Sequence, residues 1–386
     1  MFSWLASLVS SCLSPMRRYA RMGNDDTSDD GSSTAERSLF WRRDLGKHSW
    51  GEFSFAVIQA NEVIEDHSQV EIGSDAIFVG VYDGHGGPEA SVFVRDHLFQ
   101  HLMSIAKDNG TISEETLRGA VSASEDGFMT VVRRSFRIKK VIATVGSCCL
   151  IGVIWKGTLY IANVGDSRAV IGSIGGSNRI IAEQLSREHN ANIEEIREEL
   201  RALHPDDPDI VVKSRGAWRV KGIIQVTRSI GDAYLKRPQF ALDSSFPRFH
   251  LTKNITKAVL TAEPSVMSRN LQPRDRFIIF ASDGLWELLT NQEAADIVHN
   301  NPRNGIARRL LKTALRKAAR RANMTYKQLQ KVEKGKRRDY HDDITVIVVF
   351  IDHGLLGKKP KVPELSIKGF MASDGQSNFK QIQELM

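Results

Sequence analysis

Acidic residues follow several apolar stretches of this chain, at the points where β-strands would end. Asp83 opens the motif DGHGG directly after the apolar run 76–82. A strand that ends in a carboxylate and continues into glycines places an anionic side chain beside bare backbone, which a ligand can approach closely. Asp283, again followed by glycine, ends a second apolar run, and Asp343 directly precedes a third. This layout predicts a metal site.

Two further acidic positions strengthen the prediction of a metal. The pair Glu65-Asp66 follows the alternating stretch 53–60, and Asp166 lies in a turn between two strand-like runs. So many clustered carboxylates would repel one another unless cations neutralised them, and oxygen ligands favour hard ions such as Mg²⁺ or Mn²⁺ over Zn²⁺. A single Asp-Gly pair after a strand is most often only a turn. Five acidic positions at strand ends make that simpler explanation less favoured.

The apolar periodicity indicates the elements that would position these carboxylates. The predicted strands are Phe53–Ala60, Ala76–Tyr82, Ser147–Ile154, Thr158–Asn163, Arg168–Gly172, Ile223–Val226, Arg276–Ser282 and Ile344–Ile351. The predicted helices are Pro88–Lys107, Ser113–Arg134, Ala191–Leu203, Asn291–Val298 and Gly305–Arg320. Strands grouped with paired helices between them indicate a mixed α/β or α+β layered domain. The short turn at 155–157 indicates that at least part of the sheet is antiparallel.

Length and composition fit one large domain with a tail at each end. The chain has 386 residues, of which 41% are hydrophobic, enough for a large core. We expect a catalytic domain at 46–353 and tails at 1–45 and 354–386. In the first tail, apolar residues precede the arginines, whereas a signal peptide carries its positive charges first. A disordered tail is favoured there, with membrane-surface binding or acylation of Cys12 as the alternatives.

Cysteine content argues against a disulfide-rich secreted protein, and hydropathy argues against a membrane-spanning one. The three cysteines are Cys12 and the adjacent Cys148 and Cys149, which cannot form a disulfide framework, so a reducing compartment is predicted. We expect the cytoplasm, with the nucleus or the inner face of the plasma membrane as alternatives. No apolar stretch reaches the roughly 18 residues that a membrane-spanning helix requires.

The net charge of +7 is concentrated in one segment. Residues 303–338 contain fourteen Lys or Arg and one Glu, so the rest of the chain is net negative. Apolar residues at helical spacing within 305–323 predict an amphipathic helix with a cationic outer face. A solvated face is the favoured interpretation. An anionic membrane or acidic protein surface, or a nuclear address in KGKRR at 334–338, are the alternatives. Nucleic-acid binding is not expected, because Tyr326 is the one aromatic residue in the segment and stacking needs more.

Seven short motifs follow one another in a defined order. They are ED at 65–66, VYDGHGG at 81–87, TVGSCC at 144–149, IANVGDSRA at 161–169, VTRSIGD at 226–232, FASDGLWE at 280–287 and DDIT at 342–345. In this order they resemble the metal-dependent serine/threonine protein phosphatases of type 2C, the plant branch most closely. The resemblance implies an α+β fold, a four-layer α-β-β-α sandwich of two face-to-face antiparallel sheets with a metal cleft at one end. It also implies hydrolysis of phosphoserine and phosphothreonine in phosphoprotein substrates.

The resemblance further implies two Mg²⁺ or Mn²⁺ ions per subunit, with a third, weaker one in addition. Two such ions can activate a water molecule and direct it at phosphorus, so that no covalent intermediate is required. Asp83 would bridge the two ions, and Gly84 would offer its backbone carbonyl. The other implied ligands are Asp283 and Asp343 for one ion, Glu65 and Asp66 for the other, and Asp166 with Asp283 and Glu287 for the third.

His85 matches the family's general acid, which protonates the leaving serine or threonine oxygen. An unperturbed histidine pKa near 6.5 suits proton donation around neutrality. Cys148 and Cys149 are predicted to be small core residues rather than nucleophiles. His189 is assigned a structural role.

One position departs from the family pattern. Many members have an arginine that grips the substrate phosphate five residues before the position of Asp66, and this chain has Asn61 there. Asparagine has neither the charge nor the two-pronged donor geometry of arginine. The candidate replacements are Arg187, Lys213 and Arg228, and the charged stretch 187–222 is predicted to form a flap that selects substrates and regulatory proteins.

Two rival functions stay open from the sequence. Asn61 favours a catalytically impaired family member that acts as a phosphoprotein-binding regulator, whereas the intact acidic motifs argue against it. Another two-metal phosphohydrolase, such as a nuclease, would use the basic segment as its nucleic-acid footprint. The expected partners are phosphoprotein substrates, a regulatory protein at the flap and an anionic membrane surface, for a chain that acts as a monomer.

Overall fold

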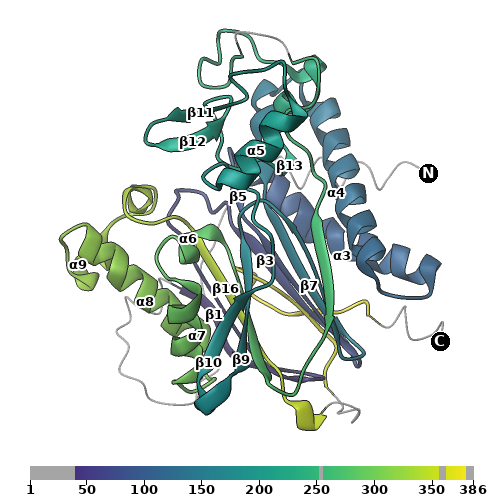
Figure 1. Cartoon of the computed structure of the whole chain (residues 1–386), viewed down its shortest axis with the longest axis vertical. Helices are drawn as coiled ribbons and strands as arrows, with labels where there is room; N and C mark the ends of the chain where they lie inside the picture. Colours follow the sequence, from purple (N-terminus) through teal and green to yellow (C-terminus); the bar gives the residue numbers. More distant parts are fainter. Residues whose placement is uncertain (1–39, 252–254, 356–361, 380–386) are drawn as a thin grey trace.

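A computed structural model describes residues 40–251, 255–355 and 362–379 of the chain. Two large antiparallel sheets are stacked, and helices cover both outer faces (Figure 1). One sheet has six strands in the order β1-β2-β16-β15-β9-β10, and the other has seven in the order β14-β8-β7-β4-β3-β17-β18. The predicted α+β class and the four-layer α-β-β-α sandwich are confirmed.

The six-stranded sheet comprises β1 (Phe40–His48), β2 (Gly51–Ile58), β9 (Arg168–Ile174), β10 (Ile180–Gln184), β15 (Asp275–Ala281) and β16 (Ile344–Phe350). The seven-stranded sheet comprises β3 (His67–Ile72), β4 (Ala76–Tyr82), β7 (Cys149–Trp155), β8 (Thr158–Val164), β14 (Ser265–Asn270), β17 (Leu365–Lys368) and β18 (Gly375–Gln376). Two smaller sheets are formed by β5 (Gly84–His85), β6 (Gly146–Ser147) and β13 (Ile230–Gly231), and by β11 (Val211–Ser214) and β12 (Ala217–Val220). The α-helices are α3 (Glu89–Asn109), α4 (Glu114–Ser135), α5 (Glu194–Leu203), α6 (Asp283–Trp286), α7 (Asn291–His299), α8 (Ile306–Arg321) and α9 (Tyr326–Lys331).

Side chains on the two faces of a central strand contribute to two different hydrophobic cores, one between the sheets and one under the helices. Phe53, Phe55 and Val57 of β2 pack between the two sheets, whereas Ala56 and Ile58 pack on the helical side. Successive residues of a strand point to opposite faces, so a continuously apolar strand is expected wherever both faces are covered. β4 and β16, which are buried along their whole length, are accordingly almost entirely apolar.

The helices divide between the two outer faces. Helices α3 and α4 pack on the seven-stranded sheet, and α7 and α8 pack on the six-stranded sheet (Figure 1). The predicted apolar face of α8 is confirmed, because its six members are at most 1% exposed. They are Ile306, Leu310, Leu311, Ala314, Leu315 and Ala318. The helix is held by this buried stripe, as expected for an amphipathic helix on a core.

The sheets extend beyond the domain limits expected from the sequence. Strand β1 begins at Phe40, inside the expected N-terminal tail, and pairs with β2. Strand β17 lies in the expected C-terminal tail and pairs with β3, and Phe379 contacts Phe99 edge to face. Charged residues interrupt the apolar ones in β1, and β17 has only four residues, so neither segment shows a clear strand pattern in the sequence. The rest of the expected first tail, with Cys12, lies outside the described residues.

One predicted strand is not formed. The stretch 223–226 makes isolated bridges through Ile224 and Val226 but no ladder, so the strand predicted there is wrong. It forms part of the connection between the β11–β12 hairpin and β13.

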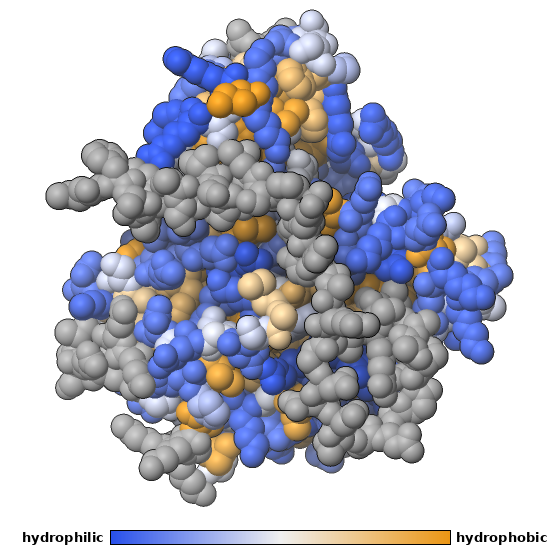
Figure 2. All heavy atoms as spheres, turned by 180° about the vertical axis from the view of Figure 1, so that it is seen from behind, coloured by the Kyte–Doolittle hydropathy of each residue, from blue (hydrophilic) through white to orange (hydrophobic). Residues whose placement is uncertain are grey.

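No helix among the described residues is long and apolar enough to cross a membrane. On the face shown in Figure 2, the hydrophobic residues outside the grey atoms gather in small groups between hydrophilic ones. The exposed large hydrophobic side chains in the described ranges are Leu45, Val63, Ile138, Ile181, Leu203 and Met371. Scattered exposure of this kind is normal for a folded domain. The expected monomer stays a prediction.

Candidate metal centre and active site

Three aspartates from both large sheets meet at one end of the sandwich. Asp83 follows β4, Asp166 follows β8 and Asp283 begins α6 directly after β15. One carboxylate oxygen from each lies within 4.8 Å of the others. Three residues that are far apart in the sequence therefore form the acidic cluster that the strand ends predicted.

The electrostatics of this cluster fit a bound cation. Burial raises the pKa of Asp83 and of Asp283 well above the ordinary value, and neighbouring carboxylates raise both further. Oδ1 of Asp283 is buried and has no hydrogen-bond partner among the described residues. A buried carboxylate oxygen without a partner is costly unless a cation compensates it. The residues present therefore suit a hard divalent ion, the kind that oxygen-only sites bind.

Glu65 and Asp66 reach the same end from the loop between β2 and β3. Oε1 of Glu65 accepts a hydrogen bond from the backbone N–H of Gly87 at 2.6 Å. Oδ2 of Asp66 accepts from the hydroxyls of Ser282 and Thr345, each at 2.8 Å. Burial raises the pKa of both carboxyls, that of Asp66 strongly. Both predicted ligands therefore lie at the acidic end, each fixed by neighbours from other motifs.

Gly84 lies where no larger residue fits. Its backbone N–H donates to the carbonyl oxygen of Glu65 at 3.2 Å. A Cβ atom at this position would lie 2.6 Å from that carbonyl and 2.6 Å from Oγ of Ser91. The glycine predicted as a backbone ligand is thus required for the close approach of the 65–66 loop to the end of β4.

The structure gives the adjacent residues Asp342 and Asp343 different surroundings. Both oxygens of Asp343 accept backbone N–H groups: Ala60 and Asn61 donate to Oδ1, and Glu65 donates to Oδ2. Asp343 therefore shapes the loop that carries Glu65. Asp342 accepts one backbone N–H, which Asp343 donates to its Oδ1 at 2.7 Å. It contributes to the raised pKa of Asp83 and Asp283, and its own pKa is raised to about 6, chiefly by burial. Asp342 therefore interacts electrostatically with the cluster, and the assignment of Asp343 as a ligand stays a prediction.

His85 is held by an aspartate that the sequence interpretation did not single out. Nε2 of His85 lies 2.7 Å from Oδ2 of Asp232, which also accepts from the hydroxyl of Ser229 at 2.6 Å. Strand β6 separates β5 from β13 and brings the two residues together. A Cβ at Gly146 would lie 2.3 Å from both contacting atoms, so a glycine is needed there.

This contact sets the charge state of His85. Burial disfavours the charged imidazolium, but the Asp232 carboxylate and its hydrogen bond outweigh burial and raise the pKa of His85. Histidine paired with a buried carboxylate holds its proton to higher pH. The contact with Asp232 therefore favours the protonated form of His85, which is the form that a general acid needs.

The cysteines and His189 support the site without doing its chemistry. Burial raises the pKa of Cys148 and of Cys149, so both are thiols at neutral pH rather than nucleophilic thiolates. The Cys148 thiol donates to Oδ1 of Asp166 at 3.2 Å, a contact that its sequence did not reveal. Burial lowers the pKa of His189 to about 3, and Nδ1 of this neutral ring accepts from Gly165 N–H at 3.3 Å.

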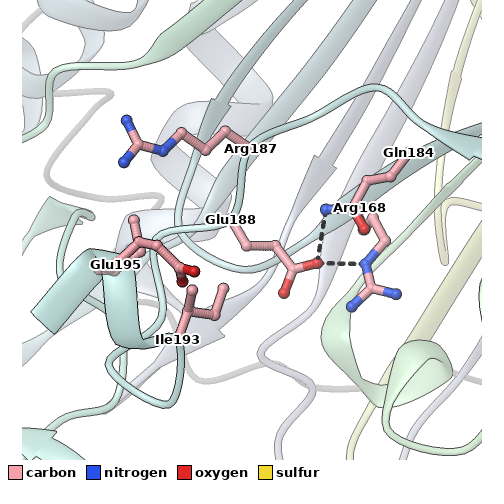
Figure 3. Close-up of a pocket in the computed structure, with 7 residues that line it drawn as sticks. Arg168, Gln184, Arg187, Glu188, Ile193 and Glu195 are labelled. Atoms are coloured by element: carbon pink, nitrogen blue, oxygen red, sulfur yellow. Dashed lines mark hydrogen bonds and ion pairs between the residues drawn. The ribbon is translucent and has the colours of Figure 1, made fainter.

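The predicted flap forms a separate layer beyond the acidic end. Helix α5 and the β11–β12 hairpin lie beyond the end of the sheets that carries β5 and α6 (Figure 1). At the base of the flap is a cavity of about 480 Å³. Arg168 and Gln184 both contact Glu188 at its wall, while Arg187 extends away from them (Figure 3). The clustered aspartates do not line this cavity, so the chemistry belongs to the carboxylates and not to the cavity.

The three cations predicted to replace the missing arginine lie on or beside the flap. Arg187 and Arg228 both pair with Glu199 of α5, at 2.7 and 2.8 Å. Lys213 is exposed on β11. Asn61 lies at the acidic end, where its side-chain amide donates to Oδ1 of Asp342 at 3.3 Å. The flap contacts hold Arg187 and Arg228 to their own layer.

Comparison with known proteins agrees with this geometry. Residues 49–324 match the family model described as protein phosphatase 2C. The chain is 62% identical to probable protein phosphatase 2C 68 of Arabidopsis thaliana, over 98% of this chain and 99% of that protein. It is 60% identical to probable protein phosphatase 2C 25 of Oryza sativa subsp. japonica, over 98% of each.

Solved structures show the same fold at much lower identity. A serine-threonine phosphatase 2C from Toxoplasma gondii aligns with a TM-score of 0.58 at 17% identity, over 81% of this chain and 99% of that one. A sex-determining protein of C. elegans aligns with a TM-score of 0.57 at 16% identity, over 79% of this chain and 66% of that one. Together with the full-length plant relatives, these findings place the chain in the plant branch of the protein phosphatase 2C family, as a metal-dependent protein serine/threonine phosphatase.

Proposed function

We propose that this phosphatase acts with two Mg²⁺ or Mn²⁺ ions per chain, and that a third, weaker ion binds beside Asp166. The observation that supports this is the group of three aspartates with a buried, unpartnered oxygen on Asp283. When bound, the ions would activate a water molecule for attack at phosphorus and offset the charge of the phosphoryl oxygens. The protein supplies the ligands, the proton and the shape of the site.

The proposed ligands follow from the surroundings of each carboxylate. Asp83 would be the central ligand, because it lies among the other acids: burial raises its pKa, and Asp283, Asp66 and Asp342 raise it further. We propose Asp342 in the place expected of Asp343, because both oxygens of Asp343 accept N–H groups from the 60–65 loop, whereas Asp342 raises the pKa of Asp83 and Asp283. The remaining ligands are Asp283, Glu65, Asp66 and the Gly84 carbonyl, with Asp166 and Glu287 at the weaker site.

His85 donates a proton to the departing serine or threonine oxygen. Its Nε2 is engaged by Asp232, which leaves Nδ1 to face the substrate. The proton moves from Nδ1 to the leaving oxygen as the phosphorus–oxygen bond breaks, so the product is an alcohol rather than an alkoxide. Asp232 acts as a positioning residue, because it fixes the ring and favours its protonated form.

A phosphothreonine peptide assay tests this proposal against the regulator alternative. We expect turnover by the wild-type chain that depends on added Mn²⁺ or Mg²⁺, and none with Asp83→Asn. Tight binding of the phosphopeptide without turnover at saturating metal would instead identify a phosphoprotein-binding regulator. Cleavage of single-stranded DNA under the same conditions would identify a nuclease.

We also propose that the flap, residues 187–222, selects protein substrates and regulatory proteins. Support comes from its position beyond the acidic end and from the hairpin β11–β12, which pairs with neither large sheet. Replacing 211–220 with a short Gly-Ser linker should lower kcat/KM for a phosphoprotein while sparing that for an aryl phosphate. Equal losses for both substrates would refute the selective role.

The basic face of α8 is proposed to contact anionic membrane surfaces from the cytoplasm. Arg309, Arg316 and Arg320 are exposed on this face. The nuclear alternative is weaker, because Arg337 of the KGKRR run is buried and donates to the carbonyls of Gln59 and Val332. Co-sedimentation with phosphatidylserine vesicles, and its loss on charge reversal at Arg309 and Arg320, tests the contact. Unchanged sedimentation of that variant would refute it.

A further inference from the structure

A substrate phosphate meets an electrostatic problem at this site. The phosphoryl group of phosphothreonine carries up to two negative charges at neutral pH. It must enter a site that the protein lines with carboxylates from Glu65 to Asp342. A protein cation that faces these carboxylates is therefore needed to orient the anion, beyond what bound ions neutralise.

Arg338 is the cation that the fold presents to this cluster. The segment before β16 lies against the 59–62 loop, because Gly335 N–H donates to Ala60 O at 2.7 Å and buried Arg337 donates to Gln59 O at 3.1 Å. This anchoring directs the next side chain to the acidic end. Nη2 of Arg338 lies 2.7 Å from Oδ2 of Asp342, and 52% of its side chain is exposed.

Arg338 interacts electrostatically with other carboxylates besides Asp342. Burial acts to lower the pKa of Arg338, but Asp342, Asp283, Asp83 and Glu287 together raise it. Its charge in turn acts to lower the pKa of Glu65, Asp342 and Glu287. The guanidinium of Arg338 thus interacts electrostatically with several carboxylates of the site.

Three other arginines near this end pair with residues outside the acidic cluster, whereas Arg338 pairs with Asp342 of the cluster. Arg168 contacts Glu188 and Asn291, and Arg187 and Arg228 converge on Glu199. Asn61 shares the carboxylate of Asp342 with Arg338 but brings no charge. Asn61 occupies the position where many family members have an arginine, and Arg338 lies beside it.

We propose that Arg338 binds the phosphoryl group of the substrate, moving from Asp342 to the phosphate oxygens. A guanidinium offers two parallel N–H donors to a phosphate, a geometry that neither asparagine nor lysine reproduces. The contact with Asp342 keeps Arg338 ordered at the acidic end before substrate arrives. This inference rests on the proposed metal-dependent hydrolysis and names the phosphate-binding residue of the same site.

Substitution of Arg338 tests the assignment, with Lys336 as the matched control. Lys336 lies in the same short turn, is exposed and pairs with Glu333. Arg338→Ala should raise KM for a phosphothreonine peptide roughly tenfold and weaken inhibition by inorganic phosphate by a similar factor, as loss of a charge-assisted contact predicts. The KM of Arg338→Lys should fall between those of the wild type and Arg338→Ala. Added guanidinium should partly restore the activity of Arg338→Ala and should not affect that of Lys336→Ala.

Binding measurements separate this role from a purely structural one. Calorimetric titration of inorganic phosphate into Mn²⁺-loaded protein needs no turnover, and Arg338→Ala should weaken phosphate binding roughly tenfold. If Arg338 only balances the charge of Asp342, the variant will bind Mn²⁺ more tightly while phosphate affinity and KM match those of Lys336→Ala. That result overturns the inference.

The same data distinguish failure of the inference from failure of the proposed function. A wild-type chain that hydrolyses the peptide, beside an Arg338→Ala variant with unchanged KM and phosphate affinity, overturns the role of Arg338 alone. A wild-type chain without turnover overturns the proposed reaction, and the phosphate titration still decides whether Arg338 binds the anion. Equal thermal unfolding of Arg338→Ala and Lys336→Ala shows that both variants are folded.

Discussion

The carboxylates of the metal centre and the cations of α8 are both dense groups of like charge, but their surroundings differ. Asp66 and Asp166 are at most 8% exposed, and burial together with neighbouring carboxylates raises the pKa of Asp83 and of Asp283. On α8, Arg309 and Arg320 are exposed, while Lys317 pairs with Glu293. Repulsion between like charges in water costs little free energy because solvent screens it. Repulsion between buried like charges costs more and requires a compensating interaction, such as a bound cation. The buried group therefore marks the functional site.

The largest expected effect is at Asp83. Asp83→Asn should lower turnover at least about 100-fold, since bound ions supply several kcal/mol of transition-state stabilisation. In metal-free protein the same change removes a repelling charge and should raise the melting temperature by a few degrees. Steady-state kinetics at saturating Mn²⁺ and thermal unfolding in EDTA measure the two effects. Activity of Asp83→Asn above a tenth of that of the wild type would refute the assignment of Asp83 as a metal ligand.

The next effect is at Asp232, which holds His85. Asp232→Asn should lower kcat by about 10- to 100-fold, because general acids contribute about 10²–10⁴ and a misdirected ring retains part of that. Asp232 raises the pKa of His85, so its loss lowers that pKa. The acid form is lost as pH rises through this pKa, and the alkaline limb of the kcat profile should move to lower pH. The exposed Asp108→Asn, outside the flap and the site, serves as control, and an unmoved limb would count against the pairing.

A smaller effect is expected at the buried thiols. Cys149→Ala should cost about 1 kcal/mol of unfolding free energy through lost burial, with activity per folded molecule within a few-fold of wild type. Cys148→Ala also removes a donor to Asp166 and should weaken metal binding there more than Cys149→Ala does. Chemical denaturation and Mn²⁺ titration of the two variants provide the measurements. A phosphocysteine trapped by rapid acid quench would contradict the whole scheme.

The smallest effect is expected on the basic face. Neutralising Arg309 and Arg320 with glutamine should change the unfolding free energy by no more than about 0.5 kcal/mol, as is usual for exposed positions. Hydrolysis of a phosphothreonine peptide should stay at the wild-type rate. A loss of activity comparable to that of Asp232→Asn would mean that the two charged regions are coupled, and the contrast between them would fail.

Much of this architecture was predictable where both faces of an element are buried. Strand β4 has the predicted bounds, and the apolar stripe of α8 was identified residue by residue, because period and burial coincide there. Strand β3 was missed since it carries Gln69 and Glu71 in the interior. Oε1 of Glu71 accepts from the Gln69 amide at 2.6 Å and from the hydroxyl of Ser366 of β17 at 2.5 Å, contacts that no local pattern shows.

Within the site, the sequence indicated which motifs converge but not which way each side chain faces. Asp342 and Asp343 are neighbours at the start of β16, and only the register decides which carboxylate meets the cluster and which meets the backbone of 60–65. Arg338 was assigned to a basic run because its acidic neighbours, Asp283 and Asp83, lie more than fifty residues away in sequence. The roles of Asp342, Asp343 and Arg338 depend on where the fold places each side chain relative to strand ends that are distant in sequence.

The most direct test of the account is a titration of Mn²⁺ into metal-stripped wild-type protein, with phosphothreonine-peptide hydrolysis as the readout. The account predicts no hydrolysis before metal is added, a rise to saturation as the ion is bound, and loss of that rise in Asp83→Asn. Full hydrolysis by protein with less than about 0.05 metal ions per chain, a level that leaves nearly every site empty by mass action, would contradict it.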